Sequence, residues 1–198
     1  MRISARPALL LLAGVALGFL TSHAALAQTE PAKKDFEIKA FKQQTRKAPN
    51  YSASGENLGG LSAWANKPWL MIEVDFSSAP EWADDVQVRY YVLIGQDKNT
   101  QMFTGQITHN NVDRGQHHYS AMFLHPSTLV RFGQGKVEAV AVQMFYKGRL
   151  MDMASDPKAN RRWWEQYTPV EGFLLTPEQT PWSIVAFQRW EAAKSSAR

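Results

Sequence analysis

The chain of 198 residues contains no cysteine. This absence excludes a disulfide framework, a thiolate metal site, a cysteine nucleophile, a CxxC redox motif and a lipid anchor on cysteine. The motifs HExxH, GxSxG, GxGxxG and the Walker loop are missing as well. The sequence therefore indicates no catalytic residue, no metal site and no cofactor, and we expect a protein that is not an enzyme.

A large excess of charge of one sign is absent, and long hydrophobic runs are confined to the start of the chain. Hydrophobic residues make up 44%, charged residues 20% and aromatic residues 12%, as in an ordinary soluble domain. The formal net charge of +4 gives no argument for a nucleic-acid partner. Beyond the N-terminus, no segment approaches the roughly 18 apolar residues that a membrane-spanning helix needs.

The N-terminus has the three parts of a secretory signal peptide. Arg2 and Arg6 are positively charged, residues 8–20 are apolar, and Ala25-Leu26-Ala27 is a small-x-small cleavage site. An uncleaved membrane anchor is the alternative, although the apolar stretch is short for a bilayer core of about 30 Å. Cleavage after residue 27 leaves 171 residues and lowers the net charge from +4 to +2, because both arginines are removed. We expect a periplasmic or secreted protein.

The rest of the chain is predicted to be a single domain with short ends. Polar residues around Pro31 predict a flexible segment over 28–34, and residues 193–198 should form a frayed tail. Between them, residues 35–192 have the size of one domain. A chain of this length can bury roughly 70% of its unfolded surface, so it can be stable without disulfides.

Apolar and polar residues alternate in several short segments, which is typical of half-buried strands. These segments are 36–40, 69–76, 86–94, 102–109, 117–124, 137–146 and 149–153. Segments 102–109 and 117–124 are predicted to form a hairpin. Segment 137–146 is largely apolar on both faces toward its C-terminal end, which indicates a central strand.

A few short helices are predicted among the strands. Residues 127–132 could form a helical turn, and residues 156–167 resemble a helix with Asp156 as its N-cap. Residues 180–190 could form a helix or a strand. In the helical interpretation four apolar side chains share one face, namely those of Trp182, Val185, Ala186 and Trp190.

Together these patterns predict a mainly β protein. The expected architecture is an antiparallel β-sandwich of the immunoglobulin-like kind, with one or two short C-terminal helices. The cysteines of true immunoglobulin domains are absent, so this prediction concerns architecture alone. A barrel of the lipocalin or OB type is the alternative.

The seven tryptophans are the most informative residues. Trp163 and Trp164 follow Arg161 and Arg162, and adjacent side chains on a helix point about 100° apart, so at most one ring can point inward. An exposed Trp beside Arg is typical of a protein-interaction hot spot and also of a sugar-stacking platform. Packing of both rings across the sandwich, with an arginine stacked on one, is the alternative. The candidate partner- or ligand-binding residues are Trp163, Trp164, Arg161, Arg162 and Trp82.

Histidines offer the one candidate metal site. If the predicted hairpin forms, His109 and His117 lie near each other at its open end, and Asp113 in the loop could complete a set of ligands. His117 and His118 point to opposite faces of a strand, so only one of them could join. Solvated hairpin histidines are the favoured interpretation, and we predict no bound metal.

The C-terminal segment Thr180-Pro-Trp-Ser-Ile-Val-Ala-Phe-Gln-Arg-Trp-Glu191 and the strand WLMIEVDF carry a resemblance to a known family. They are similar to small exported immunoglobulin-like proteins of Verrucomicrobia and Planctomycetes that are encoded beside type IV pilus assembly genes. Gln188 and Trp190 stand where the family pattern usually has Asp and Tyr. The resemblance implies an accessory role in the cell envelope, an immunoglobulin-like sandwich and no known catalysis.

Three classes of function remain open. The first is a non-enzymatic structural or protein-interaction domain with an envelope protein as partner, including a type IV pilus accessory role. The second is a carbohydrate-binding module that uses coplanar exposed rings, such as Trp163 or Trp164 with Trp82. The third is a metal-dependent or hydrolytic enzyme with a concave pocket. Buried tryptophans together with a free sheet edge would favour the first class, because a partner strand could dock there.

Overall fold

The computed structural model describes residues 34–53, 56–57, 64, 66–95, 100–134, 136–159 and 161–194. These residues all belong to one compact unit, Lys33–Arg198. The signal peptide predicted over residues 1–27 lies outside the described residues, as does most of the segment 28–34.

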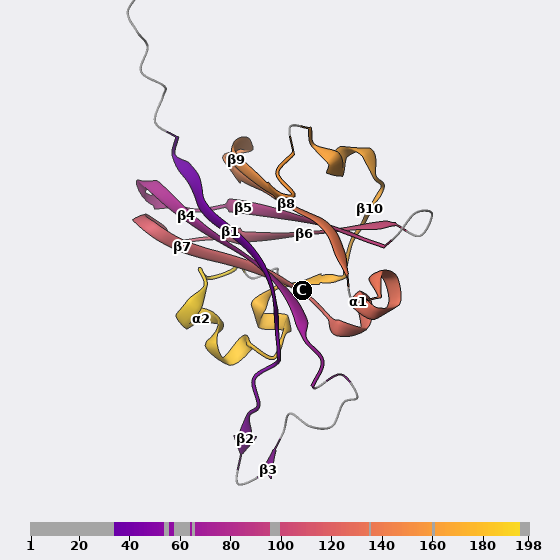
Figure 1. Cartoon of the computed structure of the whole chain (residues 1–198). Helices are drawn as coiled ribbons and strands as arrows, with labels where there is room; N and C mark the ends of the chain where they lie inside the picture. Colours follow the sequence, from indigo (N-terminus) through magenta and orange to yellow (C-terminus); the bar gives the residue numbers. More distant parts are fainter. Residues whose placement is uncertain are drawn as a thin grey trace, which may run out of the picture. The chain divides into compact units, whose positions relative to one another are not determined.

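Two sheets face each other in this unit (Figure 1). The four-stranded sheet has the order β1 (Phe36–Arg46), β4 (Trp69–Ala83), β7 (Val112–Leu124) and β11 (Leu174–Leu175). The five-stranded sheet has the order β10 (Pro169–Val170), β6 (Gln101–His109), β5 (Val86–Ile94), β8 (Val137–Tyr146) and β9 (Arg149–Asp156). All pairings in both sheets are antiparallel except the short pairing of β10 with β6. The strands β2 (Ser52–Ala53) and β3 (Glu56–Asn57) form a separate small pair.

The core lies between the two sheets because their strands alternate in burial. In β5, every second residue from Val86 to Ile94 is buried, and those between are half-buried. The inward residues of β4, from Leu70 to Phe76, join the same hydrophobic cluster. The predicted fold class, a mainly β antiparallel sandwich with short C-terminal helices, is confirmed. The predicted central strand 137–146 is β8, which lies inside its sheet.

The C-terminal segment is helical and covers the outer face of the four-stranded sheet. It contains η3 (Pro177–Gln179), η4 (Ser183–Val185) and α2 (Ala186–Arg189). Its apolar side packs on the outward side chains of β4 and β7 in a second cluster, whose buried members are Trp69, Met71, Ala121, Phe123, Trp182, Ala186 and Trp190. Residues 180–190 therefore follow the helical interpretation of the sequence.

Two local predictions are wrong. The helix predicted over residues 156–167 does not form as one element. Its predicted N-cap, Asp156, is the last residue of β9 and pairs with Val140, and among the described residues of this segment only η2 (Trp163–Gln166) is helical. The second error concerns the end of the strand predicted over residues 69–76, which extends well beyond Phe76. There β4 continues to Ala83 through two register irregularities, which let the ladder with β7 continue past Pro80.

The predicted hairpin of segments 102–109 and 117–124 is also wrong. The first segment is β6, which pairs with β5, and the second belongs to β7, which pairs with β4 in the opposite sheet. The chain therefore crosses between the sheets at Asn110 and Asn111. The helical turn predicted over 127–132 is confirmed as α1 (Pro126–Gly133).

Candidate functional site

The outer edge of β6 is only partly covered by the rest of the chain. At one end, Met102 and Phe103 pair with β10. At the other end, the Lys194 N–H donates to the Thr108 carbonyl at 2.6 Å, and Ala193 bridges to His109. Ala193 and Lys194 were predicted to belong to a frayed tail, and these contacts attach them to the sandwich instead.

Between these two covered ends, Thr104–Ile107 has no strand partner on its outer side within the described part of the chain. Backbone groups of successive strand residues alternate in direction, and the Thr108 carbonyl points outward to Lys194. The N–H and C=O groups of Thr104 and Gln106 therefore point outward too. The parallel pairing of Val170 with Phe103 uses the Thr104 N–H, so the Thr104 carbonyl and both Gln106 groups are the ones left without a strand partner. This stretch is a free sheet edge, where another chain could pair.

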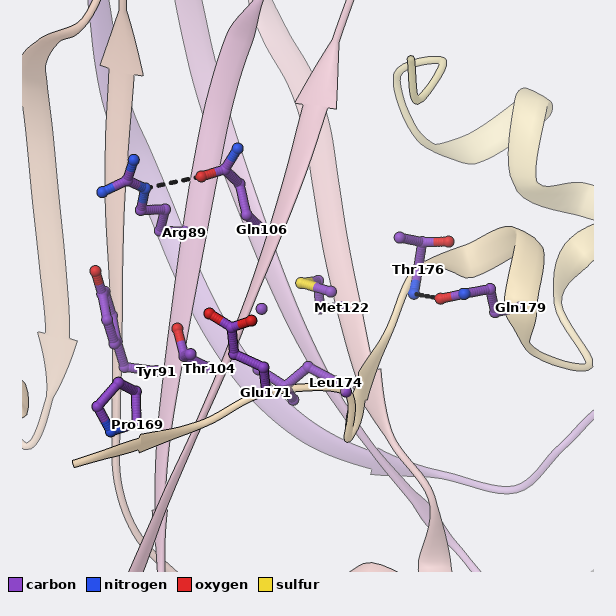
Figure 2. A pocket seen from close by; sticks show the side chains of 12 residues that line it. Arg89, Tyr91, Thr104, Gln106, Met122, Pro169, Glu171, Leu174, Thr176 and Gln179 are labelled. Atoms are coloured by element: carbon purple, nitrogen blue, oxygen red, sulfur yellow. Dashed lines mark hydrogen bonds between the residues drawn. The ribbon is translucent and has the colours of Figure 1, made fainter. Parts of the chain in front are cut away.

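A cavity of about 630 Å³ runs beside this free edge. Figure 2 shows Arg89 and Tyr91 on one strand, Thr104 and Gln106 on the next, and Glu171 facing them from the connection between β10 and β11. Further residues line it, namely Gly105, Met122, Pro169, Gly172, Leu174, Thr176 and Gln179. The wall thus combines a free backbone edge, a cation, an anion and an apolar floor.

Arg89 is the cation of this cavity. Its Nε donates to Gln106 Oε1 at 2.8 Å, and its guanidinium lies 4.6 Å from the centre of the Phe145 ring. No carboxylate lies within 4.0 Å of it among the residues that the structure describes. Arg89 therefore has charge available for a ligand in the cavity.

Tyr91 forms the neighbouring part of the wall and is held in place from two sides. Its hydroxyl donates to Gln143 Oε1 at 2.9 Å, and its ring stacks on Trp164 with centroids 5.5 Å apart and planes 20° apart. Burial raises the pKa of the Tyr91 hydroxyl. Trp164 thus fixes the position of the Tyr91 ring by stacking on it.

Gly105 packs against Leu174 and Met122 of the opposite sheet. A Cβ atom on Gly105 would lie 2.8 Å from the Leu174 Cβ and 2.8 Å from the Met122 Cε. The methionine end can move, but the Leu174 Cβ is carried by β11, which pairs with β7. The absent side chain therefore sets the spacing between β6 and β11.

We expect Gly105→Ala to lower the free energy of unfolding by about 1–3 kcal/mol, because the added methyl overpacks this contact. Urea denaturation measures the change. Gln106→Ala is the matched control, since Gln106 is the exposed next residue, and it should change stability by less than about 0.5 kcal/mol. Equal stability of Gly105→Ala and the wild type would contradict the close packing of β11 on β6.

The residues predicted as a binding site are only partly brought together. Trp163 and Trp164 pack against each other with centroids 5.5 Å apart and planes 86° apart, and Trp164 is only 6% exposed. Arg161 and Arg162 are exposed, and Arg162 pairs with Glu165 at 3.1 Å. Trp82 is 65% exposed at the end of β4 and so belongs to the other sheet.

The cavity residues themselves were missed by the sequence reasoning. The alternation in β5 places Arg89 and Tyr91 on the same outward face, and this was the available signal. The sequence pattern does not say that β5 lies next to a partly free strand, so the two side chains looked like an ordinary solvated face.

The histidines considered as a candidate metal set lie in other surroundings, and His109 is not solvated as expected. His109 is fully buried, its Nδ1 lies 3.1 Å from the Glu191 carbonyl, and its Nε2 lies 2.8 Å from Ser120 Oγ, which also accepts from Tyr90 at 2.7 Å. The Glu191 carbonyl can only accept, so Nδ1 carries the proton and Nε2 accepts from Ser120. Burial lowers the pKa of His109 to about 4.

His117 and His118 likewise have other partners. His117 Nδ1 lies 3.2 Å from Asp75 Oδ2, and His118 Nδ1 lies 2.9 Å from Glu191 Oε1. Within the described residues, no three His, Asp or Glu side chains are grouped as metal ligands. The set of His109, His117 and Asp113 depended on the hairpin, which does not form.

The fold defines this protein as a two-sheet antiparallel β-sandwich, and comparison places it in a family. One family model matches residues 27–197, so the chain belongs to that family. A crystal structure of a protein from Akkermansia muciniphila, a verrucomicrobial bacterium, has the same fold with a TM-score of 0.68 and 20% identity, over 82% of this chain and 94% of that one. No protein with a curated description matches the chain.

Proposed function

We propose that this chain is a non-enzymatic protein-interaction domain that is exported to the cell envelope and acts there as an accessory of type IV pili. The observation that carries the proposal is the free stretch Thr104–Ile107 of β6. Outward backbone groups at a sheet edge are a template on which another polypeptide can pair. The adjoining cavity adds side-chain contacts to that template.

The burial of the tryptophans supports the same function. Four of the seven are buried, and they pack in the hydrophobic clusters on the outer faces of the two sheets: Trp69, Trp164, Trp182 and Trp190. The high aromatic content is therefore used mainly for stability. A sugar-binding platform needs exposed coplanar rings, whereas the Trp163 and Trp164 planes are almost perpendicular.

Export and the pilus role rest on the sequence. The signal-peptide features of residues 1–27 support export, and the resemblance of residues 180–191 to envelope proteins encoded beside pilus genes supports the accessory role. In the described part of the chain, no helix has the length and apolar character required to cross a membrane.

Photo-crosslinking in the native bacterium tests the proposal. A benzoyl-phenylalanine placed at exposed position 82, 106 or 187 should capture an envelope protein from at least one position, and pilus components should be among the captured proteins. Met153, exposed on the edge strand β9, serves as the comparison position. Export of the protein without capture from any position would refute the interaction function. Retention on glycans that is lost in Trp82→Ala would favour the sugar-binding alternative instead.

A further inference from the structure

The free edge of β6 has a defined length. It runs from Thr104 to Ile107 between the end of β10 and the hydrogen bond from Lys194, and four extended residues span about 13 Å. Two residues within it, Thr104 and Gln106, direct their N–H and C=O groups outward. Because the pairing of Val170 with Phe103 already uses the Thr104 N–H, the gap fits a short extended segment that can form about three main-chain hydrogen bonds.

The two faces of this gap differ in chemistry. Side chains of a strand alternate between its faces, so a segment paired with β6 would present successive side chains to opposite sides. One side meets Met122 and Leu174, which are buried and apolar. The other side meets the Arg89 guanidinium. Glu171, on the far wall, is the one acidic residue among those that line the cavity.

We propose that an extended segment of a partner protein adds to Thr104–Ile107 of β6, with an apolar side chain over Met122 and Leu174 and an acidic side chain beside Arg89. This inference rests on the proposed interaction function and specifies its site and the chemistry of the partner. The backbone pairing supplies affinity, and the alternating side chains supply selectivity. A guanidinium favours a carboxylate because it can donate two parallel hydrogen bonds to it.

Glu171 sharpens the selectivity. Its carboxylate lines the opposite wall, on the connection from β10 to β11, so an acidic side chain near that wall is repelled. The acidic residue of the segment is therefore favoured only on the Arg89 side.

The probes are two blocked synthetic peptides, Thr-Val-Glu-Val-Thr and Thr-Val-Lys-Val-Thr, titrated into the folded protein and followed by backbone amide NMR. We expect the Glu peptide to shift the Gln106 amide. It should also bind at least about tenfold more tightly than the Lys peptide, the difference that one charge-assisted hydrogen bond makes. Equal binding of the two peptides, or shifts confined to another surface, would overturn the inference.

Backbone pairing is tested on the wild-type protein with N-methylated Glu peptides. Only alternate amides of an added strand face its neighbour. Methylation of the central amide and methylation of the two valine amides should therefore have unequal effects, with one abolishing binding and the other leaving it nearly unchanged. Equal effects would exclude strand addition.

Protein variants locate the contacts. Arg89→Gln should weaken the Glu peptide about tenfold or more, whereas Glu171→Gln, the matched control, should not weaken it. Gln106→Pro removes an outward N–H and should abolish binding, whereas Gln106→Thr keeps that N–H and should bind. Thermal unfolding checks that each variant is folded. Binding by Gln106→Pro equal to that of Gln106→Thr would count against the site.

The crosslinking experiment separates this inference from the proposed function. Capture of an envelope protein from position 187 or 82, without capture from 106 and without peptide binding, would leave the interaction function intact and refute the β6 site. Failure at every position refutes both.

Discussion

Trp190→Ala should lower the free energy of unfolding by about 3–5 kcal/mol. Trp190 is 5% exposed, and its ring packs edge-on against Phe123 with centroids 5.6 Å apart. Its Nε1 also donates to Glu73 Oε2 at 3.1 Å. The substitution leaves a cavity on the outer face of the four-stranded sheet and removes one donor from a buried carboxylate, although Arg189 still pairs with Glu73 at 2.8 Å.

Phe187→Ala is the matched control for this prediction. Phe187 lies in the same helix, α2, but is 74% exposed, so its loss should change stability by less than about 0.5 kcal/mol. Urea denaturation of the two variants measures the difference. A loss below about 1 kcal/mol in Trp190→Ala would show that the C-terminal segment does not pack on the sheet as described.

Acidification from pH 6.5 to pH 4 should lower the free energy of unfolding by about 3 kcal/mol through His109 alone. Burial lowers the pKa of His109 from 6.5 to about 4 in the folded protein. Below pH 6.5 the unfolded chain takes up a proton at this position before the folded protein does, so acid favours unfolding. The loss is complete near pH 4, where the folded protein also takes up the proton.

Denaturation at pH 7, 5.5 and 4 measures this dependence. His109→Gln should be less stable than the wild type at pH 7 and should show a smaller loss between pH 6.5 and 4. His117→Gln is the control for replacing an exposed histidine. A His109→Gln slope equal to that of the wild type would show that another group controls the acid sensitivity.

The strands were largely predictable, because burial on one face of a sheet imposes a two-residue period that a short sequence window displays. In β5 the observed burial follows that period from Val86 to Ile94. Boundaries were less accurate where pairing overrode a local signal. Pro80 indicates the end of a strand, yet β4 continues past it because bulges keep it in register with β7.

The candidate site was not predictable in the same way. Arg89, Gln106 and Glu171 are distant in sequence, and their meeting depends on β10 covering only the first part of β6. His109 was likewise assigned to a solvent-exposed hairpin end. Its burial depends on Ser120 of the opposite sheet and on the C-terminal segment, and no local pattern records either contact.

The sequence alone determined most of the strands and the absence of cysteine chemistry, because each depends on residue type and short-range spacing. It left residues 180–190 open between helix and strand. The tertiary structure alone decided which strands pair, which tryptophans are buried and where an edge stays free. The order of strands in a sheet depends on contacts between residues far apart in the sequence. Several strand orders would be compatible with the same alternation of apolar and polar residues. The four buried tryptophans thus belong to the packed clusters of the fold, while the site proposed for the partner is a stretch of backbone that residue types do not reveal.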